Sequence, residues 1–245
     1  MKIIAFAVAT LFALPSQAAI VSYDFTAVVS HMFEYNGATS QVTTVTESAM
    51  SGVQIANGYT VHGRFSFDTM TPLSSIYQPE QPAGGSYLLY SDAPANTTTL
   101  SFDQNGYTYR SRAEGLSSLI QVANRLPGQG ADVFSLSTYN SSMPSSFESS
   151  TLNLFDLDGR AFGSGAIPTT LDLALFGYAN IGYGWLRRAD GSQVHANADL
   201  TSMRLVAAAV PEPDSWALMC LGIAVLGAAG ARGRTRNAGA RRTST

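Results

Sequence analysis

The feature that most constrains the fold is a two-residue alternation of apolar and polar side chains, repeated in short stretches between residues 20 and 206. In YTVHGRFSFD (59–68), Val61, Phe65 and Phe67 fall on one face, whereas His62 and Arg64 fall on the other. Successive side chains of a strand point to opposite faces, so the pattern predicts strands with one buried side. About ten such stretches, with no convincing amphipathic helix between them, predict an all-β fold. We expect an antiparallel two-sheet sandwich of the jelly-roll type, with an open barrel as the alternative.

Turn residues divide the alternating stretches into strands. Asn105-Gly106 and Asp190-Gly191 accept positive φ, so each can join two antiparallel strands through a two-residue turn. The stretches 71–85 and 139–150 are rich in Ser, Pro and Gly and are expected to form loops at the rim of the sandwich. Further strands are expected near residues 21–30, 86–90, 117–123, 132–138, 151–155, 170–176 and 199–206.

The N-terminal segment, residues 1–18, has the pattern of a secretory signal peptide. Lys2 precedes an uncharged apolar run over residues 3–14, and the small residues Ser16 and Ala18 occupy the positions that signal peptidase recognises. We therefore expect cleavage after Ala18 and export of the mature chain through the secretion machinery.

The composition of the remaining body excludes some kinds of stabilisation and some partners. The single cysteine, Cys220, lies in the C-terminal apolar segment, so the body at 19–209 cannot form an internal disulfide. Residues 19–210 carry 15 Asp and Glu against 8 Arg and no Lys, a net charge of −7 (8 − 15). An acidic body argues against a nucleic-acid partner, because phosphates require basic patches.

A search of the body for chemistry yields one weak metal candidate. His31, His62 and His195 are scattered along expected strands without a metal-ligand spacing, so no zinc site is predicted. Asp156 and Asp158, followed by a glycine, could direct two carboxylates toward a calcium ion. The rest of a calcium loop is absent, and a tight polar turn is the favoured interpretation. We predict no catalytic residues and no cofactor, and do not expect an enzyme.

The C-terminal end carries the most specific signal in the chain. Residues 215–231 are an uncharged apolar run of transmembrane length, although at the short limit of it. The tail at 232–245 then supplies five arginines: Arg232, Arg234, Arg236, Arg241 and Arg242. Positive residues beside an apolar segment stay on the cytoplasmic side, so this pair of elements predicts a stop-transfer helix with the body outside.

A proline-rich motif, Val210-Pro211-Glu212-Pro213, precedes this helix. The two prolines fix φ and remove backbone donors, which keeps the segment extended, as a protease requires. The order of motif, apolar helix and arginine cluster over 210–245 resembles the PEP-CTERM sorting domain of exported bacterial proteins. The resemblance implies an exosortase partner, a membrane-embedded cysteine protease that cuts near the motif, and a Gram-negative host that makes exopolysaccharide.

Three classes of function remain open for the body. We expect a cell-surface or extracellular-matrix protein with a structural or exopolysaccharide-associated (biofilm) role, because this needs nothing beyond what the sequence contains. The alternatives are a secreted carbohydrate- or calcium-binding module, and a secreted hydrolase. The expected route passes through the inner membrane, where the anchor is transient and the body lies in the periplasm, to the surface or the medium.

Overall fold

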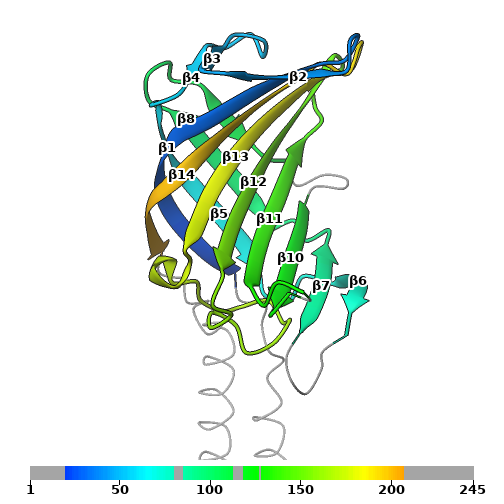
Figure 1. Cartoon of the computed structure of the whole chain (residues 1–245), viewed down its shortest axis with the longest axis vertical. Coiled ribbons are helices and arrows are strands. Elements are labelled where there is room, and N and C mark those ends of the chain that lie inside the picture. Colours follow the sequence, from blue (N-terminus) through cyan, green and yellow to red (C-terminus); the bar gives the residue numbers. More distant parts are fainter. Residues whose placement is uncertain (1–19, 80–84, 113–117, 127, 207–245) are drawn as a thin grey trace, which may run out of the picture. The chain divides into compact units, whose positions relative to one another are not determined.

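The computed structural model describes residues 20–79, 85–112, 118–126 and 128–206, and most of these residues lie in β-strands (Figure 1). The described part contains no helix long and apolar enough to cross a membrane. The predicted signal peptide, including Ser16 and Ala18, lies outside the described residues, as do the motif at 210–213, the helix at 215–231 and the arginines.

Twelve strands form one antiparallel sheet in the order β6-β7-β10-β11-β12-β13-β14-β1-β5-β8-β9, and β2 pairs with the last residues of β1. A separate two-stranded ribbon consists of β3 (Glu47–Ser48) and β4 (Ile55–Ala56). The strands of the large sheet are β1 (Ile20–Asn36), β2 (Gln41–Val45), β5 (Thr60–Asp68), β6 (Leu73–Gln78), β7 (Ser86–Ser91), β8 (Thr97–Phe102), β9 (Thr108–Arg110), β10 (Ser118–Asn124), β11 (Asp132–Asn140), β12 (Ser146–Asp156), β13 (Tyr178–Arg187) and β14 (Gln193–Val206).

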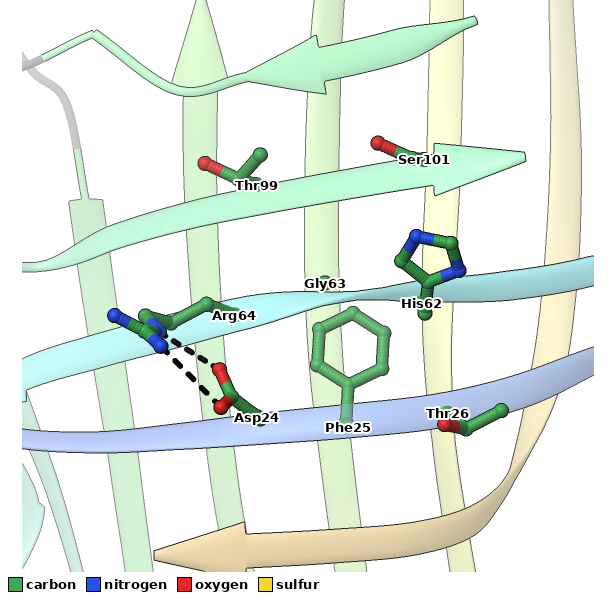
Figure 2. Close-up of a pocket in the computed structure, with 8 residues that line it drawn as sticks. All are labelled: Asp24, Phe25, Thr26, His62, Gly63, Arg64, Thr99 and Ser101. Atoms are coloured by element: carbon green, nitrogen blue, oxygen red, sulfur yellow. Dashed lines mark hydrogen bonds and ion pairs between the residues drawn. The ribbon is translucent and has the colours of Figure 1, made fainter. Parts of the chain in front are cut away.

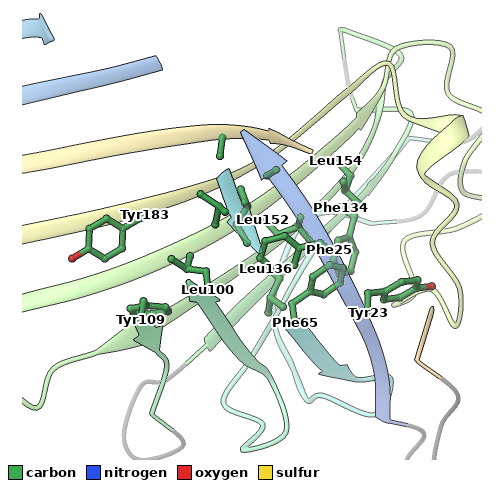
Figure 3. Packing of buried hydrophobic residues seen from close by; sticks show 14 of the residues in the cluster. Tyr23, Phe25, Phe65, Leu100, Tyr109, Phe134, Leu136, Leu152, Leu154 and Tyr183 are labelled. Atoms are coloured by element: carbon green, nitrogen blue, oxygen red, sulfur yellow. The ribbon is translucent and has the colours of Figure 1, made fainter. Parts of the chain in front are cut away.

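The sheet curls so that its inner face packs against itself around one hydrophobic core (Figure 3). Phe67 on β5 and Phe134 on β11 have ring centroids 5.1 Å apart, although four strands separate β5 from β11 in the sheet. Phe102 on β8 likewise meets the edge of Tyr183 on β13, at 5.8 Å between centroids. These contacts across the concave side give each strand the single buried face that the alternation predicts.

The prediction of an antiparallel all-β fold is confirmed, but the structure does not have the two separate sheets of a sandwich. Its single curled sheet is a half-barrel, closer to the open-barrel alternative. β1 connects the two halves, because it pairs with β14 along one edge and with β5 and β2 along the other. Register shifts after Thr26 and Val29 interrupt its pairing with β14, and bulges of this kind bend a strand and increase its twist.

Three local predictions were wrong. The stretch 170–176 was expected to be a strand, but it contains a 3₁₀ turn at Leu173–Leu175, where the Asp172 side chain accepts a hydrogen bond from the Ala174 N–H at 3.0 Å. Leu171 and Phe176 still pack on the core, so the apolar residues there reflect burial without a strand. The expected loop at 71–85 contains the edge strand β6, and the expected loop at 139–150 contains the end of β11 and the first residues of β12.

Both predicted hairpins are present, with loops longer than two residues. Gly106 and Gly191 have φ of +69° and +73°, whereas neither Asn105 nor Asp190 has a positive φ. Each of those polar side chains instead accepts a hydrogen bond from the backbone N–H two residues ahead: Tyr107 for Asn105 at 2.7 Å, and Ser192 for Asp190 at 3.0 Å. The side chain thereby stabilises the longer turn that the glycine completes.

Candidate functional site

A hollow of about 560 Å³ lies on the outer face of the sheet where β1, β5 and β8 run side by side (Figure 2). Alternation along the strands places Asp24, His62 and Arg64 outward, beside hydroxyl groups of Thr26, Thr99 and Ser101. Gly63 lies on the central strand of this hollow. A Cβ there would collide with the Thr99 carbonyl oxygen of β8, so only glycine permits this approach of the two strands.

The charged side chains in and beside this hollow are paired with one another. Arg64 Nε donates to Asp24 Oδ1 at 2.7 Å and Nη2 to Oδ2 at 3.2 Å. The hydrogen bond from Arg64 holds the pKa of Asp24 below its ordinary value, and the same bond raises the pKa of Arg64. His62 Nδ1 lies 2.7 Å from Asp103 Oδ1, at the edge of the hollow. Both pairs are solvent-exposed, so the hollow offers a ligand polar contacts but no unpaired catalytic carboxylate.

A second polar cluster lies on the inner face, around Glu148 of β12. Glu148 is 3% exposed, and its Oε1 accepts hydrogen bonds from the Tyr107 hydroxyl and, at 2.8 Å, from the Tyr183 hydroxyl. Burial, reinforced by these bonds and by the carboxylate, raises the pKa of both tyrosines far above its ordinary value. The gap beside Tyr183, lined by residues such as Val29, Leu100 and Phe102, is too narrow for water. The two tyrosine hydroxyls therefore satisfy a buried carboxylate.

The three histidines lie on three different strands, as the sequence suggested. His31 on β1 and His62 on β5 are exposed, whereas His195 on β14 stacks on Phe33 with ring centroids 4.7 Å apart. Burial lowers the pKa of His195, which favours its neutral form. Within the ranges that the structure describes, no group of three or more His, Cys, Asp or Glu side chains is placed to hold a metal ion.

The calcium candidates Asp156 and Asp158 lie in the turn that ends β12. Asp156 Oδ1 accepts from the Asp158 N–H at 2.9 Å, and Oδ2 accepts from the N–H groups of Arg160 and Ala161 at 2.6 and 2.8 Å. Burial by itself would raise the pKa of Asp156, but these donors outweigh burial and lower it. Asp158 is exposed and pairs with Arg160. The carboxylates thus organise a polar turn, the interpretation that the sequence favoured.

Sequence reasoning missed the two polar clusters for different reasons. Asp24 and Arg64 are 40 residues apart, and only the register of β1 with β5 brings them together. Glu148 fell within a stretch interpreted as a loop, at 139–150. The signal that could have found it is the two-residue period of Leu152 and Leu154, which places Glu148 on their buried face once the strand is extended toward Ser146.

Comparison with known families identifies one segment of the chain. Residues 209–234 match the PEP-CTERM protein-sorting motif, a range that includes Val210–Pro213, the apolar run at 215–231 and two of the five arginines. Neither the curated proteins nor the solved structures include a significant match to the chain. The match confirms the resemblance drawn from the sequence, and it supports export and exosortase sorting. The chain is therefore a PEP-CTERM sorting domain-containing protein.

Proposed function

We propose that this chain is a precursor whose β-rich body is delivered to the cell surface or the extracellular matrix. The observation that carries the proposal is the sorting-motif match at 209–234. In this route signal peptidase removes residues 1–18, and residues 215–231 anchor the body transiently in the inner membrane, with the arginines on the cytoplasmic side. Exosortase then cuts near Val210–Pro213 and releases the body.

Within this proposal the body has a structural or exopolysaccharide-associated role and is not an enzyme. The outer-face hollow supports this assignment, because its Asp24–Arg64 pair is internally neutralised and exposed. Glu148 supports it too, since it is 3% exposed and one of its oxygens accepts hydrogen bonds from both tyrosine hydroxyls. General acid–base catalysis needs a titratable group within reach of a substrate. In the hollow, Asp24 and Arg64 are committed to each other, which leaves the exposed His62 beside Asp103 as the titratable group that a substrate could reach.

The test of the sorting proposal is replacement of Pro211, Glu212 and Pro213 by alanine in the full-length chain. The apolar run and the arginines are unchanged, so membrane topology is expected to persist while cleavage is blocked. Uncut precursor accumulates in the inner membrane, detected by fractionation and intact mass. Deletion of the exosortase gives the same phenotype in the parent chain.

A matched variant separates the motif from the anchor. Replacing the five arginines by glutamine leaves the motif intact and weakens retention before cleavage. The rival is a permanent single-pass anchor in which the motif is only a stiff spacer. If the alanine variant and the parent fractionate alike, with the same mass, in a host with an active exosortase, the sorting proposal is wrong.

A further inference from the structure

A second hollow, of about 500 Å³, lies on the outer face away from the hollow of Figure 2. It is lined by Leu119, Tyr139, Phe147 and three serines, on strands β6, β7, β10, β11 and β12. The rings of Tyr139 and Phe147 lie side by side, with centroids 5.5 Å apart and an interplanar angle of 30°. Both side chains remain partly exposed, so the hollow combines aromatic surface with the accessible serines Ser74 and Ser91, whereas Ser118 is buried and accepts a hydrogen bond from Asn96.

Phe147 also lines a smaller hollow, which continues across β12, β13 and β14. Its other lining residues include Ser149, Gly184, Gln193 and His195. A Cβ at Gly184 would approach Ser149 Oγ to 2.6 Å and the His195 ring to 3.2 Å, so the missing side chain keeps this space open. The two hollows meet at Phe147. We call the combined surface the Phe147 groove.

The chemistry of the Phe147 groove restricts its occupant. With His195 neutral, none of the described residues lining either hollow carries a formal charge. The guanidinium of Arg188 beside the hollows lies over one face of the Phe147 ring, 6.0 Å from its centroid, and its Nε donates to the Ser146 carbonyl oxygen at 3.1 Å, so one cation borders the groove. A polyanion would therefore find no row of cations here to neutralise its charges.

The position of the groove's aromatic residues in the sheet excludes a second kind of ligand there. Strands β11, β12 and β13 are central, and each forms backbone ladders with a neighbour on both sides. An extended peptide cannot add to them as a further strand, because recognition of that kind needs a free edge. A ligand over these three strands must instead bind through side chains; of the strands that line the groove, the edge strand is β6, which contributes Ser74.

We propose that the Phe147 groove binds a neutral polysaccharide chain, with sugar rings stacked on Phe147 and Tyr139 and sugar hydroxyls bonded to the serine, glutamine and histidine groups. A pyranose has an apolar C–H face for an aromatic ring and a rim of hydroxyls for neutral donors and acceptors. Two hollows that share Phe147 as a lining residue suit an extended chain better than a single sugar. The inference gives the proposed exopolysaccharide association a place on the molecule, and its binding test is independent of whether sorting occurs.

The test is affinity electrophoresis of the exported protein in gels containing mixed-linkage β-glucan, galactomannan or dextran, with polygalacturonate as the anionic comparison. At least one neutral polymer is expected to retard the parent protein. Phe147→Ala is expected to lower the association constant about tenfold, which is the affinity that one stacked aromatic ring contributes. Phe147→Trp retains binding. Tyr77→Ala removes an exposed aromatic residue that lines neither hollow, and it binds as the parent does.

Folding of each variant is verified by circular dichroism, and Tyr139→Ala replaces Phe147→Ala if the latter does not fold. Retardation by the neutral polymer is expected to be unchanged between about 0.05 and 0.5 M salt, because no ionic contact is involved. Three results overturn the proposal: retardation by polygalacturonate alone, no retardation by any polymer, or equal retardation of the parent and the folded groove variants.

Discussion

The turn at the end of β12 gives the sharpest test of the structure, through Asp156→Ala. This 3%-exposed carboxylate accepts three backbone N–H donors at 2.6–2.9 Å. Hydrogen bonds to a charged group contribute about 1.5–3 kcal/mol each. Asp158 and Arg160 are exposed, so water can replace part of what their amides lose. We predict a loss of about 3 kcal/mol in the free energy of unfolding at pH 7, which lowers Tm by roughly 6–12 °C.

The matched control is Asp158→Ala, two residues along the same turn. Asp158 pairs with Arg160, but its side chain is 66% exposed, so we expect its loss to cost less than about 0.5 kcal/mol. Urea titration monitored by circular dichroism measures both variants. Equal stabilities for the two variants, or a loss below about 1 kcal/mol for Asp156→Ala, refute the assigned role of the carboxylate.

The same residue predicts a direction for the pH dependence. The pKa of Asp156 is lowered in the folded state, so the carboxylate contributes stability above the unfolded value of about 3.9. That contribution is lost as the pH falls through the folded-state pKa. The stability gap between the parent and Asp156→Ala is therefore expected to narrow below about pH 4. A gap that stays constant from neutral to strongly acidic pH contradicts this reasoning.

Two further predictions concern the core. Burial raises the pKa of Tyr107 and Tyr183, so the stability that these tyrosines contribute is present below about pH 10 and is lost as the pH rises further. Glu148→Gln is expected to reduce this loss of stability at alkaline pH, which is measured as Tm against pH. Phe134→Ala is expected to cost about 3–5 kcal/mol in urea titrations, because Phe134 is fully buried, whereas Tyr77→Ala at an exposed edge stays within about 0.5 kcal/mol of the parent. Curves of Tm against alkaline pH that coincide for the parent and Glu148→Gln contradict the role given to Glu148. Similar losses in the free energy of unfolding for Phe134→Ala and Tyr77→Ala contradict the burial difference between the two aromatic residues.

Local sequence patterns correctly predicted those features that depend only on residues close together in the chain. Alternation identified β5, and the turn residues at 105–106 and 190–191 located both hairpins. The polar turn at Asp156 follows from the same local logic, since its acceptor bonds reach only five residues ahead. The PEP-CTERM motif is also local, because its parts follow one another directly in the chain.

Long-range features could not be predicted in this way. Alternation states which face of a strand is buried, but it does not reveal whether two groups of strands are joined by hydrogen bonds. The alternation of the two strands that carry Phe67 and Phe134 would be the same whether the rings met across a sandwich or across a curled sheet. The Phe147 groove combines residues from seven strands, and two of its aromatic residues, Tyr139 and Phe147, lie in a stretch interpreted as a loop.

The pairing of β1 with β14 has a consequence for the order of events during export. β1 opens the described chain, and one of its edges has no partner until β14, the last strand, has been supplied. Pairing strands from the two ends of a sequence is slow, because the intervening chain loses its loop-closure entropy before the contacts between the strands form. A body that crosses a membrane from its N-terminus therefore cannot complete its sheet until nearly all of it has emerged. By then, if the stop-transfer segment acts as proposed, translocation is already arrested, and folding finishes on a tethered chain.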